Sequence, residues 1–396
     1  MRTGSARWGV VGLGLVAAIV GGAFAFGVPE PQGCGGVQEE VGTIEGQAVR
    51  QLCNGRQREL STDSNHCGAC NHPCLGGTCK QGKCQPFVLA YTKEAKFLAL
   101  DSTYAYWTSD FGTVNRVPLV GGPVTVLATP INPRGIAIDS SHVYFTSFSS
   151  IVPYVDYSES PPPFHKGGML HQVPLAGGVA TELPIEIGDL APDRIFLTGD
   201  DIYFLAGGSI YGSEEERESA PKALYVMPKG GGTTSVLVNQ QKGRSYSLNG
   251  SNFFWKKSSG SPGQIYTLRL NGGSETVLAN AVPSGGRVIA ADLYRVLFTA
   301  DSGIYWIPTS GGQAPVSVYG YRETANQFIG QLALDSQNLY WSEIDVRTGN
   351  SVIRKKGLSG TPNVMVANVS DVSSDIVVDA NAIYIAGKNS IWKIAK

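Results

Sequence analysis

The sequence predicts an all-β fold, a seven-bladed β-propeller preceded by a small disulfide-rich module and an N-terminal hydrophobic helix. From Phe87 onward a unit of about 40 to 50 residues recurs, each copy with an aromatic strand and most with a glycine turn. Charged residues make up 16% of the chain, and 50 of the 396 residues are glycine. This composition favours short strands joined by tight turns, and it agrees with the repeat.

The repeat is clearest between Phe97 and Ala128, where four strand-like segments follow one another. Its aromatic or apolar anchor recurs after 38, 59, 51, 43, 43 and 44 residues. The anchors are Tyr106, Tyr144, Tyr203, Phe254, Leu297, Tyr340 and Tyr384. The last unit supplies three strands, and the segment from Pro86 to Thr92 has the pattern of the missing fourth. We therefore expect this segment to close the ring, since closure protects the sheet edges. Six blades is the alternative if the unit around Leu297 is not a blade.

The N-terminus has the layout of an export signal. Arg2 and Arg7 precede an uncharged apolar run from residue 8 to residue 28, and Ala23-Phe24-Ala25 offers a cleavage site. The run is also long enough to span a bilayer, so a cleaved signal peptide (residues 1–28) and a membrane tether both remain open. Lipid attachment at Cys34, in a linker over 29–52, is a third option. Each alternative predicts an exported protein that is secreted or held in the cell envelope.

All seven cysteines lie between Cys34 and Cys84. Residues 53–85 are too few and too poor in aliphatic side chains to form a core, so we expect disulfides to stabilise them. The six candidates are Cys53, Cys67, Cys70, Cys74, Cys79 and Cys84. A zinc site built from some of these cysteines with His66 and His72 is a weaker alternative, and a redox role for Cys67-x2-Cys70 is weaker still. The spacing leaves the connectivity open.

Two family resemblances follow from these motifs. The segment LSTDSNHCGACNHPCLGGTCKQGKC, from Leu60 to Cys84, resembles the Stig1-like cysteine-rich modules of exported proteins, although Gln57 stands near a position where such modules often carry a further cysteine. Residues 86–396, with Tyr106-Trp107-Thr108 and Tyr340-Trp341-Ser342, resemble the YWTD propellers of lipoprotein-receptor type, which usually have six blades. The first resemblance implies a cell-surface spacer or adhesion module, and the second implies a propeller.

Composition and motifs exclude several functions. A net charge of −1 does not suit a nucleic-acid binder. The histidines at 142, 165 and 171 are spread through the propeller and predict no catalytic pair. Asp or Asn begins a tight turn in each unit, where it is expected to bind its own backbone rather than a metal. These turn residues are Asp101, Asp139, Asp200, Asn249, Asp292, Asp335 and Asp379. We predict no catalytic residue, no metal and no cofactor.

The long connections are all expected on one face of the propeller, which is where binding sites usually lie. They span 148–166, 184–193, 207–222 and 318–329, and they carry the aromatic candidates Tyr154, Tyr157, Phe164 and Tyr211. Nine or ten residues before five of the seven anchors stands a basic residue. These are Lys96, Arg134, Arg194, Arg244 and Arg287. Converging basic side chains would form an anion site at the channel mouth on the same face.

The sequence therefore predicts a non-enzymatic binding or scaffold protein, a monomeric propeller whose partner is a protein or an anionic glycan at the cell surface. The alternative is a propeller enzyme of lyase or lactonase type with its site at the channel mouth. Apolar inner strands such as Phe97 to Asp101 argue against a metal on the axis, and hence against that enzyme. A purely structural spacer, with no ligand, is a third reading of the same pattern.

Overall fold

A computed structural model describes residues 50–148, 167–210, 213, 216–217, 220–241, 245–257, 262–286, 288–324 and 326–396. The predicted export segment, with its tether alternative, and Cys34 lie outside these residues. Within them, no helix combines the length and the apolar character that crossing a membrane requires.

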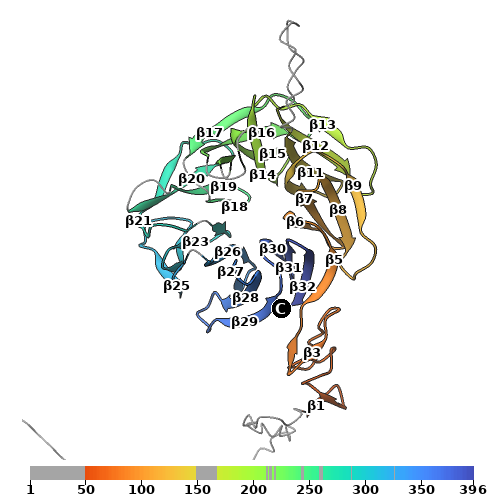
Figure 1. The fold of residues 1–396 in the computed structure, drawn as a ribbon. Coiled ribbons are helices and arrows are strands. Elements are labelled where there is room, and N and C mark those ends of the chain that lie inside the picture. The colour runs from red at the N-terminus through yellow and green to blue at the C-terminus, as the bar shows by residue number, and fades with distance from the viewer. Residues whose placement is uncertain are drawn as a thin grey trace, which may run out of the picture. The chain divides into compact units, whose positions relative to one another are not determined.

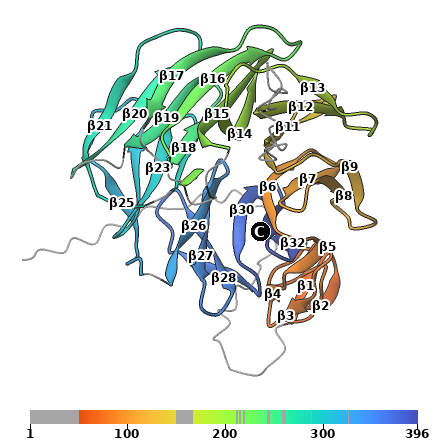
Figure 2. The ribbon, with the colours of Figure 1, turned by 45° about the horizontal axis from the view of Figure 1, so that its top comes forward.

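Seven four-stranded antiparallel sheets follow one another around an axis, so the seven-bladed prediction is confirmed (Figures 1 and 2). Blade 1 holds β6 (Ala95–Leu100), β7 (Tyr104–Ser109), β8 (Thr113–Pro118) and β9 (Thr125–Ala128). Blade 2 holds β10 (Pro133–Ile138), β11 (His142–Phe148), β12 (Gly168–Pro174) and β13 (Thr181–Leu183). Blade 3 holds β14 (Leu190–Thr198), β15 (Asp201–Ser209), β16 (Lys222–Pro228) and β17 (Ser235–Gln241).

Blade 4 holds β18 (Ser245–Leu248), β19 (Asn252–Lys257), β20 (Gly263–Arg269) and β21 (Thr276–Val282). Blade 5 holds β22 (Ile289–Ala291), β23 (Arg295–Ala300), β24 (Gly303–Pro308) and β25 (Val316–Gly320). Blade 6 holds β26 (Gln327–Leu334), β27 (Asn338–Asp345), β28 (Asn350–Gly357) and β29 (Val364–Val369). Blade 5 contains Leu297 and is a complete sheet, so the six-bladed alternative is wrong.

Blade 7 closes the ring as predicted. It combines β30 (Ser373–Val378), β31 (Ala382–Gly387) and β32 (Ser390–Ala395) with the N-terminal strand β5 (Phe87–Tyr91). Strand β5 pairs antiparallel with β32, and Figure 1 shows the two ends of the propeller side by side. Leu89 packs in one buried cluster with Tyr384 of blade 7 and Trp107 of blade 1. The closing strand therefore joins the last blade to the first through both hydrogen bonds and apolar packing.

The core lies between neighbouring blades. Tyr106 and Val114 of blade 1 share a buried cluster with Ile136 and Phe145 of blade 2, and most blade pairs form a similar cluster. The anchors predicted from the repeat are buried in these clusters, which confirms their structural role. Burial of both faces of each sheet explains why the apolar positions of the repeat are so regular.

The turn aspartates cap their own backbone, as predicted. In blade 6, Oδ1 of Asp335 accepts hydrogen bonds from the backbone N–H groups of Gln337 and Asn338. Its Oδ2 accepts a second bond, 2.9 Å long, from the hydroxyl of Tyr340, five residues on. The same Asp–Tyr bond recurs in the pairs Asp101–Tyr106, Asp139–Tyr144 and Asp379–Tyr384. Asp200 differs, because it lies inside the turn between β14 and β15 after Gly199 with φ +57°.

Three disulfides hold the cysteine module, which contains β1 (Arg50–Cys53), β2 (Arg56–Glu59), β3 (Cys79–Lys80) and β4 (Lys83–Cys84). They join Cys53 to Cys70, Cys67 to Cys79, and Cys74 to Cys84. All six predicted cysteines are therefore oxidised, and this overturns both the zinc and the redox alternatives. Zinc requires free thiolates, and Cys67 and Cys70 are each bonded to a different partner. The bonds indicate an oxidising, extracytoplasmic environment.

The cysteine module contacts blade 7, the blade that the N-terminal strand completes. A ring nitrogen of His72, Nε2, lies 2.8 Å from the backbone oxygen of Lys396. Ala395 packs with Cys67 and Cys84, and Leu75 packs against the cluster that joins blades 7 and 1. The module thus covers apolar surface beside the closing strand.

We expect peptide mapping without reductant to recover the three cysteine pairs of the structure and no others among these six residues. Each closed loop is 10 to 17 residues long in sequence separation, and such loops typically contribute about 2–4 kcal/mol to stability. Digestion of the unreduced protein followed by mass spectrometry checks this result. A linked pair of any other composition would contradict the observed connectivity.

Candidate functional site

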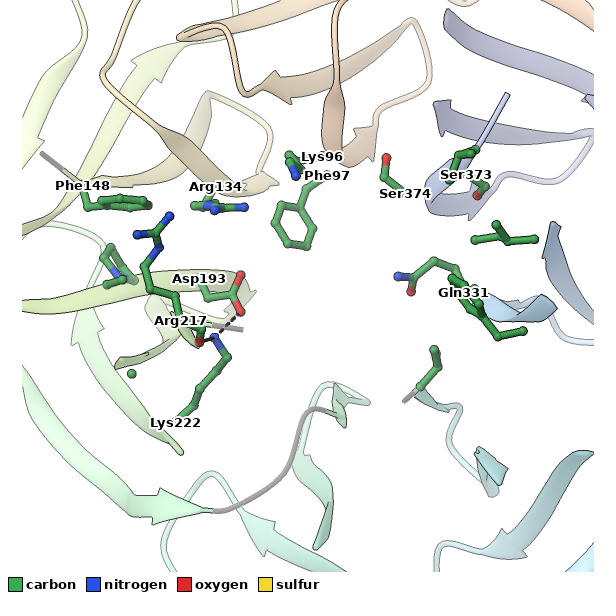
Figure 3. A pocket seen from close by; sticks show the side chains of 18 residues that line it. Lys96, Phe97, Arg134, Phe148, Asp193, Arg217, Lys222, Gln331, Ser373 and Ser374 are labelled. Atoms are coloured by element: carbon green, nitrogen blue, oxygen red, sulfur yellow. Dashed lines mark hydrogen bonds and ion pairs between the residues drawn. The ribbon is translucent and has the colours of Figure 1, made fainter. Parts of the chain in front are cut away.

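A cavity of about 350 Å³ opens at the channel mouth, on the face that carries the long connections (Figure 3). One side carries Phe148, Arg134, Arg217, Lys222 and Asp193, and the opposite side carries Gln331, Ser373 and Ser374. The remaining lining residues are Lys96, Phe97, Ala191, Pro192, Gly207, Val288, Phe328, Gly330, Ile344 and Val372. A second cavity of about 270 Å³ shares Phe97, Val288 and Gln331 with the first, so it adjoins the mouth.

Bulges in the innermost strands place the mouth residues. In five blades the pairing between first and second strands shifts register just after the strand begins, for example between Ala95 and Leu98 or between Pro133 and Ile136. A bulge leaves residues unpaired and redirects their side chains. The residues at these shifts include Lys96, Arg134, Asp193, Gly330 and Ser374, each ten positions before its anchor.

Buried hydroxyl groups fix the backbone at two of these positions. Thr108 lies two residues after the blade 1 anchor and donates a 2.7 Å hydrogen bond to the carbonyl oxygen of Arg134. Thr146, the equivalent residue of blade 2, donates one of the same length to the carbonyl oxygen of Asp193. Both threonine side chains are inaccessible to solvent. Blades 1 and 2 thus each hold the bulge of the next blade, which fixes this part of the mouth.

Positive charge predominates in the mouth. Among the described lining residues, four are cationic and one, Asp193, is a carboxylate. The Lys222 ammonium lies 2.8 Å from Asp193, and the Lys96 ammonium lies 2.8 Å from Asp110. The guanidiniums of Arg134 and Arg217 stand 5.7 and 4.6 Å from the ring centroid of Phe148. Both guanidiniums therefore lie close to the same aromatic ring.

The cationic side chains around Asp193 favour its ionised form. Burial alone would raise its pKa, but the Lys222 ammonium, and then the Arg194 and Arg134 guanidiniums, hold that pKa below its ordinary value. The carboxylate therefore stays charged and orients Lys222, which is itself buried. The pair neutralises one of the four positive charges among the described lining residues.

The five predicted basic residues fall into three groups: two line the mouth, one lines the second cavity, and two lie outside the described part of the chain. Lys96 and Arg134 line the mouth as expected. Arg194 lines the second cavity instead, because Asp193 occupies the equivalent bulge position and Arg194 is one residue further along the strand. The other predicted site residues lie outside the described part of the chain. They are Arg244, Arg287, Tyr154, Tyr157, Phe164 and Tyr211.

Arg194 faces a buried acid in the second cavity. Its Nη2 lies 3.9 Å from Oδ1 of Asp375, and its guanidinium stands 4.7 Å from the ring centroid of Phe97. Burial raises the pKa of Asp375, despite Arg194 and two backbone N–H bonds that oppose the shift. Arg194 and Asp375 therefore form an ion pair that lines the second cavity.

Several mouth residues were not predicted. Arg217 lies in the connection after β15, Lys222 begins β16, and Phe148 ends β11, so none follows the repeat position used to find the basic ring. Gln331 and Ser373 flank bulge positions that carry no charge. A better signal would have been the residues at the end of each second strand and the start of each third, since these also border the mouth.

One histidine contacts a serine within blade 2. The sequence predicts no catalytic pair for the histidines, and in the structure Nε2 of His171 lies 2.8 Å from Oγ of Ser147. The two residues meet because β11 and β12 pair within blade 2. Ser147 is completely buried, and a nucleophile must be reached by its substrate. The pair therefore satisfies the hydrogen bonding of a blade interior.

Comparisons with known proteins bear on the fold alone. No protein-family model and no curated protein matches the chain. Similar solved structures include the computationally designed protein Ika8, with 12% identity, a TM-score of 0.51, and 81% of this chain and 89% of that chain covered. YCF48 from Cyanidioschyzon merolae aligns at 12% identity and a TM-score of 0.55, over 78% of this chain and 98% of its own.

A puromycin-hydrolysing peptidase of Mycobacterium tuberculosis aligns at 13% identity and a TM-score of 0.52, over 76% of this chain and about half (51%) of its own. A chain of a nidogen–laminin complex aligns at 15% identity, with a lower TM-score of 0.44, over 67% of this chain and 97% of its own. The matches with TM-scores above 0.5 show a shared propeller fold and bear on nothing beyond the fold. The YWTD resemblance stays a prediction.

Proposed function

We propose that this protein is an extracytoplasmic binding module whose channel mouth holds an anionic group of a protein or glycan partner. The observation that carries the proposal is the mouth cavity itself, in which Arg134 and Arg217 stack on Phe148 beside the Lys222–Asp193 pair. Planar guanidiniums bind carboxylates and sulfates through paired hydrogen bonds.

Rigidity supports binding at this place. The bulges and the Thr108 and Thr146 hydrogen bonds fix the mouth before any ligand arrives, so little conformational entropy is lost on binding. Asp193, the one carboxylate among the described lining residues, is paired with Lys222. This arrangement suits the holding of an anion better than proton transfer, which needs an acid or base able to change its charge. A structurally similar propeller, YCF48, is described as bound to D1 peptide, which shows that the fold can serve in peptide binding.

The test is the double variant Arg134→Ala/Arg217→Ala, titrated with polygalacturonate, dextran sulfate and short peptides that end in a free carboxylate. Hydrogen bonds to charged groups contribute about 1.5–3 kcal/mol each, so we expect the affinity for the bound anion to fall at least tenfold. Arg347→Ala is the matched control, because its side chain is 73% exposed and lies outside the mouth. If the double variant binds as the control does, or the wild type binds no anion, the proposal is wrong.

A further inference from the structure

We infer that the mouth takes the C-terminal carboxylate of a polypeptide whose last side chain is apolar. This inference rests on the proposed function and chooses between its two classes of partner. Three groups of lining residues carry it: the guanidiniums on one side, uncharged polar groups opposite (Figure 3), and apolar side chains that line the same cavity.

The guanidiniums match a carboxylate in charge and in shape. Arg134 and Arg217 come from different blades and share the ring of Phe148, so their planar groups gather at one place in the cavity. A carboxylate has two oxygens in one plane and can accept a forked pair of N–H bonds. Nearby, Lys222 is paired with Asp193, so the carboxylate of Asp193 is neutralised where a ligand carboxylate would approach.

The apolar surface argues against a glycan. Phe97, Phe328, Val288, Val372 and Ile344 all line the same cavity. Acidic sugars carry hydroxyl groups around the ring, and each hydroxyl pressed against apolar atoms without a partner costs about 1–3 kcal/mol. An aliphatic or aromatic side chain next to a carboxylate gains from the same surface.

The polar groups opposite can receive the main chain of a peptide. Figure 3 shows the amide of Gln331 directed into the cavity, where it can both donate and accept hydrogen bonds. Oγ of Ser373 is buried and has no hydrogen-bond partner among the described residues. The Ser374 hydroxyl is held by the carbonyl oxygens of Ala95 and Ala386, so it positions the strand rather than a ligand.

The size of the cavity favours a chain end. Its volume of about 350 Å³ lies near the lower limit for ligand pockets. The adjoining second cavity leads into the channel, where Arg194 and Asp375 face each other. A polymer that continued in both directions would need a groove, whereas a terminus needs a single entrance.

Three acetylated tetrapeptides test the inference by calorimetry on the full chain. Acetyl-Gly-Gly-Ala-Leu with a free carboxylate is expected to bind. Its C-terminal amide is expected to bind at least tenfold more weakly, since it lacks the charge that the guanidiniums pair with. A peptide ending in serine with a free carboxylate is expected to lose about tenfold, because it offers less apolar surface.

Two variants locate the apolar contact. Phe328→Ser removes a partly exposed mouth residue and is expected to weaken the leucine acid about tenfold while leaving the serine acid unchanged. Val346→Ser changes an exposed residue, 46% accessible, outside the cavity and should alter neither affinity.

The outcomes separate this inference from the proposed function. If polygalacturonate or dextran sulfate binds and is lost in Arg134→Ala/Arg217→Ala, while no peptide acid binds, the inference is overturned and the anion site stands. If the peptide acid and its amide bind equally, the inference is likewise overturned. If no anion of either class binds, both proposals fail together.

Discussion

The substitution Leu89→Asp is expected to unfold the propeller. Leu89 lies in the closing strand β5, is 4% exposed, and packs among residues of blades 7 and 1. An aspartate there would bury an unpaired charge and remove an apolar side chain, at a combined cost of about 4 kcal/mol or more. The stability of an ordinary domain is only about 5–15 kcal/mol, so this loss removes a large part of it. Near-ultraviolet circular dichroism at 25 °C should show that the native signal is lost. Thermal and urea unfolding, followed by the same signal, should show no cooperative transition.

Tyr91→Asp is the matched control for this result. It introduces the same charge two residues away in the same strand, at a side chain that is 81% exposed. We expect its unfolding midpoint to stay close to that of the wild type. A cooperative, wild-type transition in Leu89→Asp would show that the ring does not depend on its N-terminal strand.

The second large effect is expected for Asp335→Ala. Asp335 accepts five hydrogen bonds, from two backbone N–H groups, from the side-chain amide of Asn338, from the Tyr340 hydroxyl, and from the Lys396 ammonium at 2.6 Å. Its loss leaves the buried Tyr340 hydroxyl and the Lys396 ammonium without this acceptor, and we expect the free energy of unfolding to fall by about 2–4 kcal/mol. Asp200→Ala in blade 3 is the control, because that side chain is exposed in its turn and should change stability by less than about 0.5 kcal/mol. Equal losses in the two variants would contradict the role given to the Asp–Tyr bond.

The hydrogen bonds of Asp335 should also make the stability of the protein depend on pH in the acid range. Partial burial opposes ionisation of Asp335, but the Lys396 ammonium and the N–H and O–H donors hold its pKa well below the usual range. A pKa that is lower in the folded state than in the unfolded state stabilises the protein above the unfolded value of about 3.9. This contribution is lost as the pH falls below about 4. The stability difference between wild type and Asp335→Ala, measured by urea unfolding from pH 7 to pH 3, should therefore shrink in acid. A difference that stays constant would show that the charge of Asp335 is not involved.

The sequence was sufficient to predict the features that recur in every blade. Anchors such as Tyr106 recur because every blade must bury the same position, and the pattern of the segment from Pro86 to Thr92 matched the strand that the last blade lacks. The six disulfide cysteines could be identified from their clustering, but their pairing could not, because spacing does not determine which sulfurs meet in a module of loops.

The mouth could be predicted only in part. Lys96 and Arg134 occupy repeat positions, so the sequence identified them, whereas Arg217 and Phe148 border the mouth from the ends of connections of unequal length. Arg194 shows the limit most clearly. Arg194 lies one residue after the strand position that borders the mouth. Because the strand has a bulge there, that difference of one residue places its side chain in the second cavity. Pattern counting cannot resolve such a step, because bulges alter register without a fixed sequence signal.

Arginine side-chain resonances offer the most direct test of the mouth as an anion site. In protein labelled with ¹⁵N-arginine, the Nε–H signals of Arg134 and Arg217, assigned by substitution, are recorded during titration with the leucine-ending peptide acid. Both signals are expected to shift together and saturate, while the exposed Arg347 signal stays in place. Saturating shifts at Arg347 with none at Arg134 and Arg217 would place binding elsewhere and contradict the account.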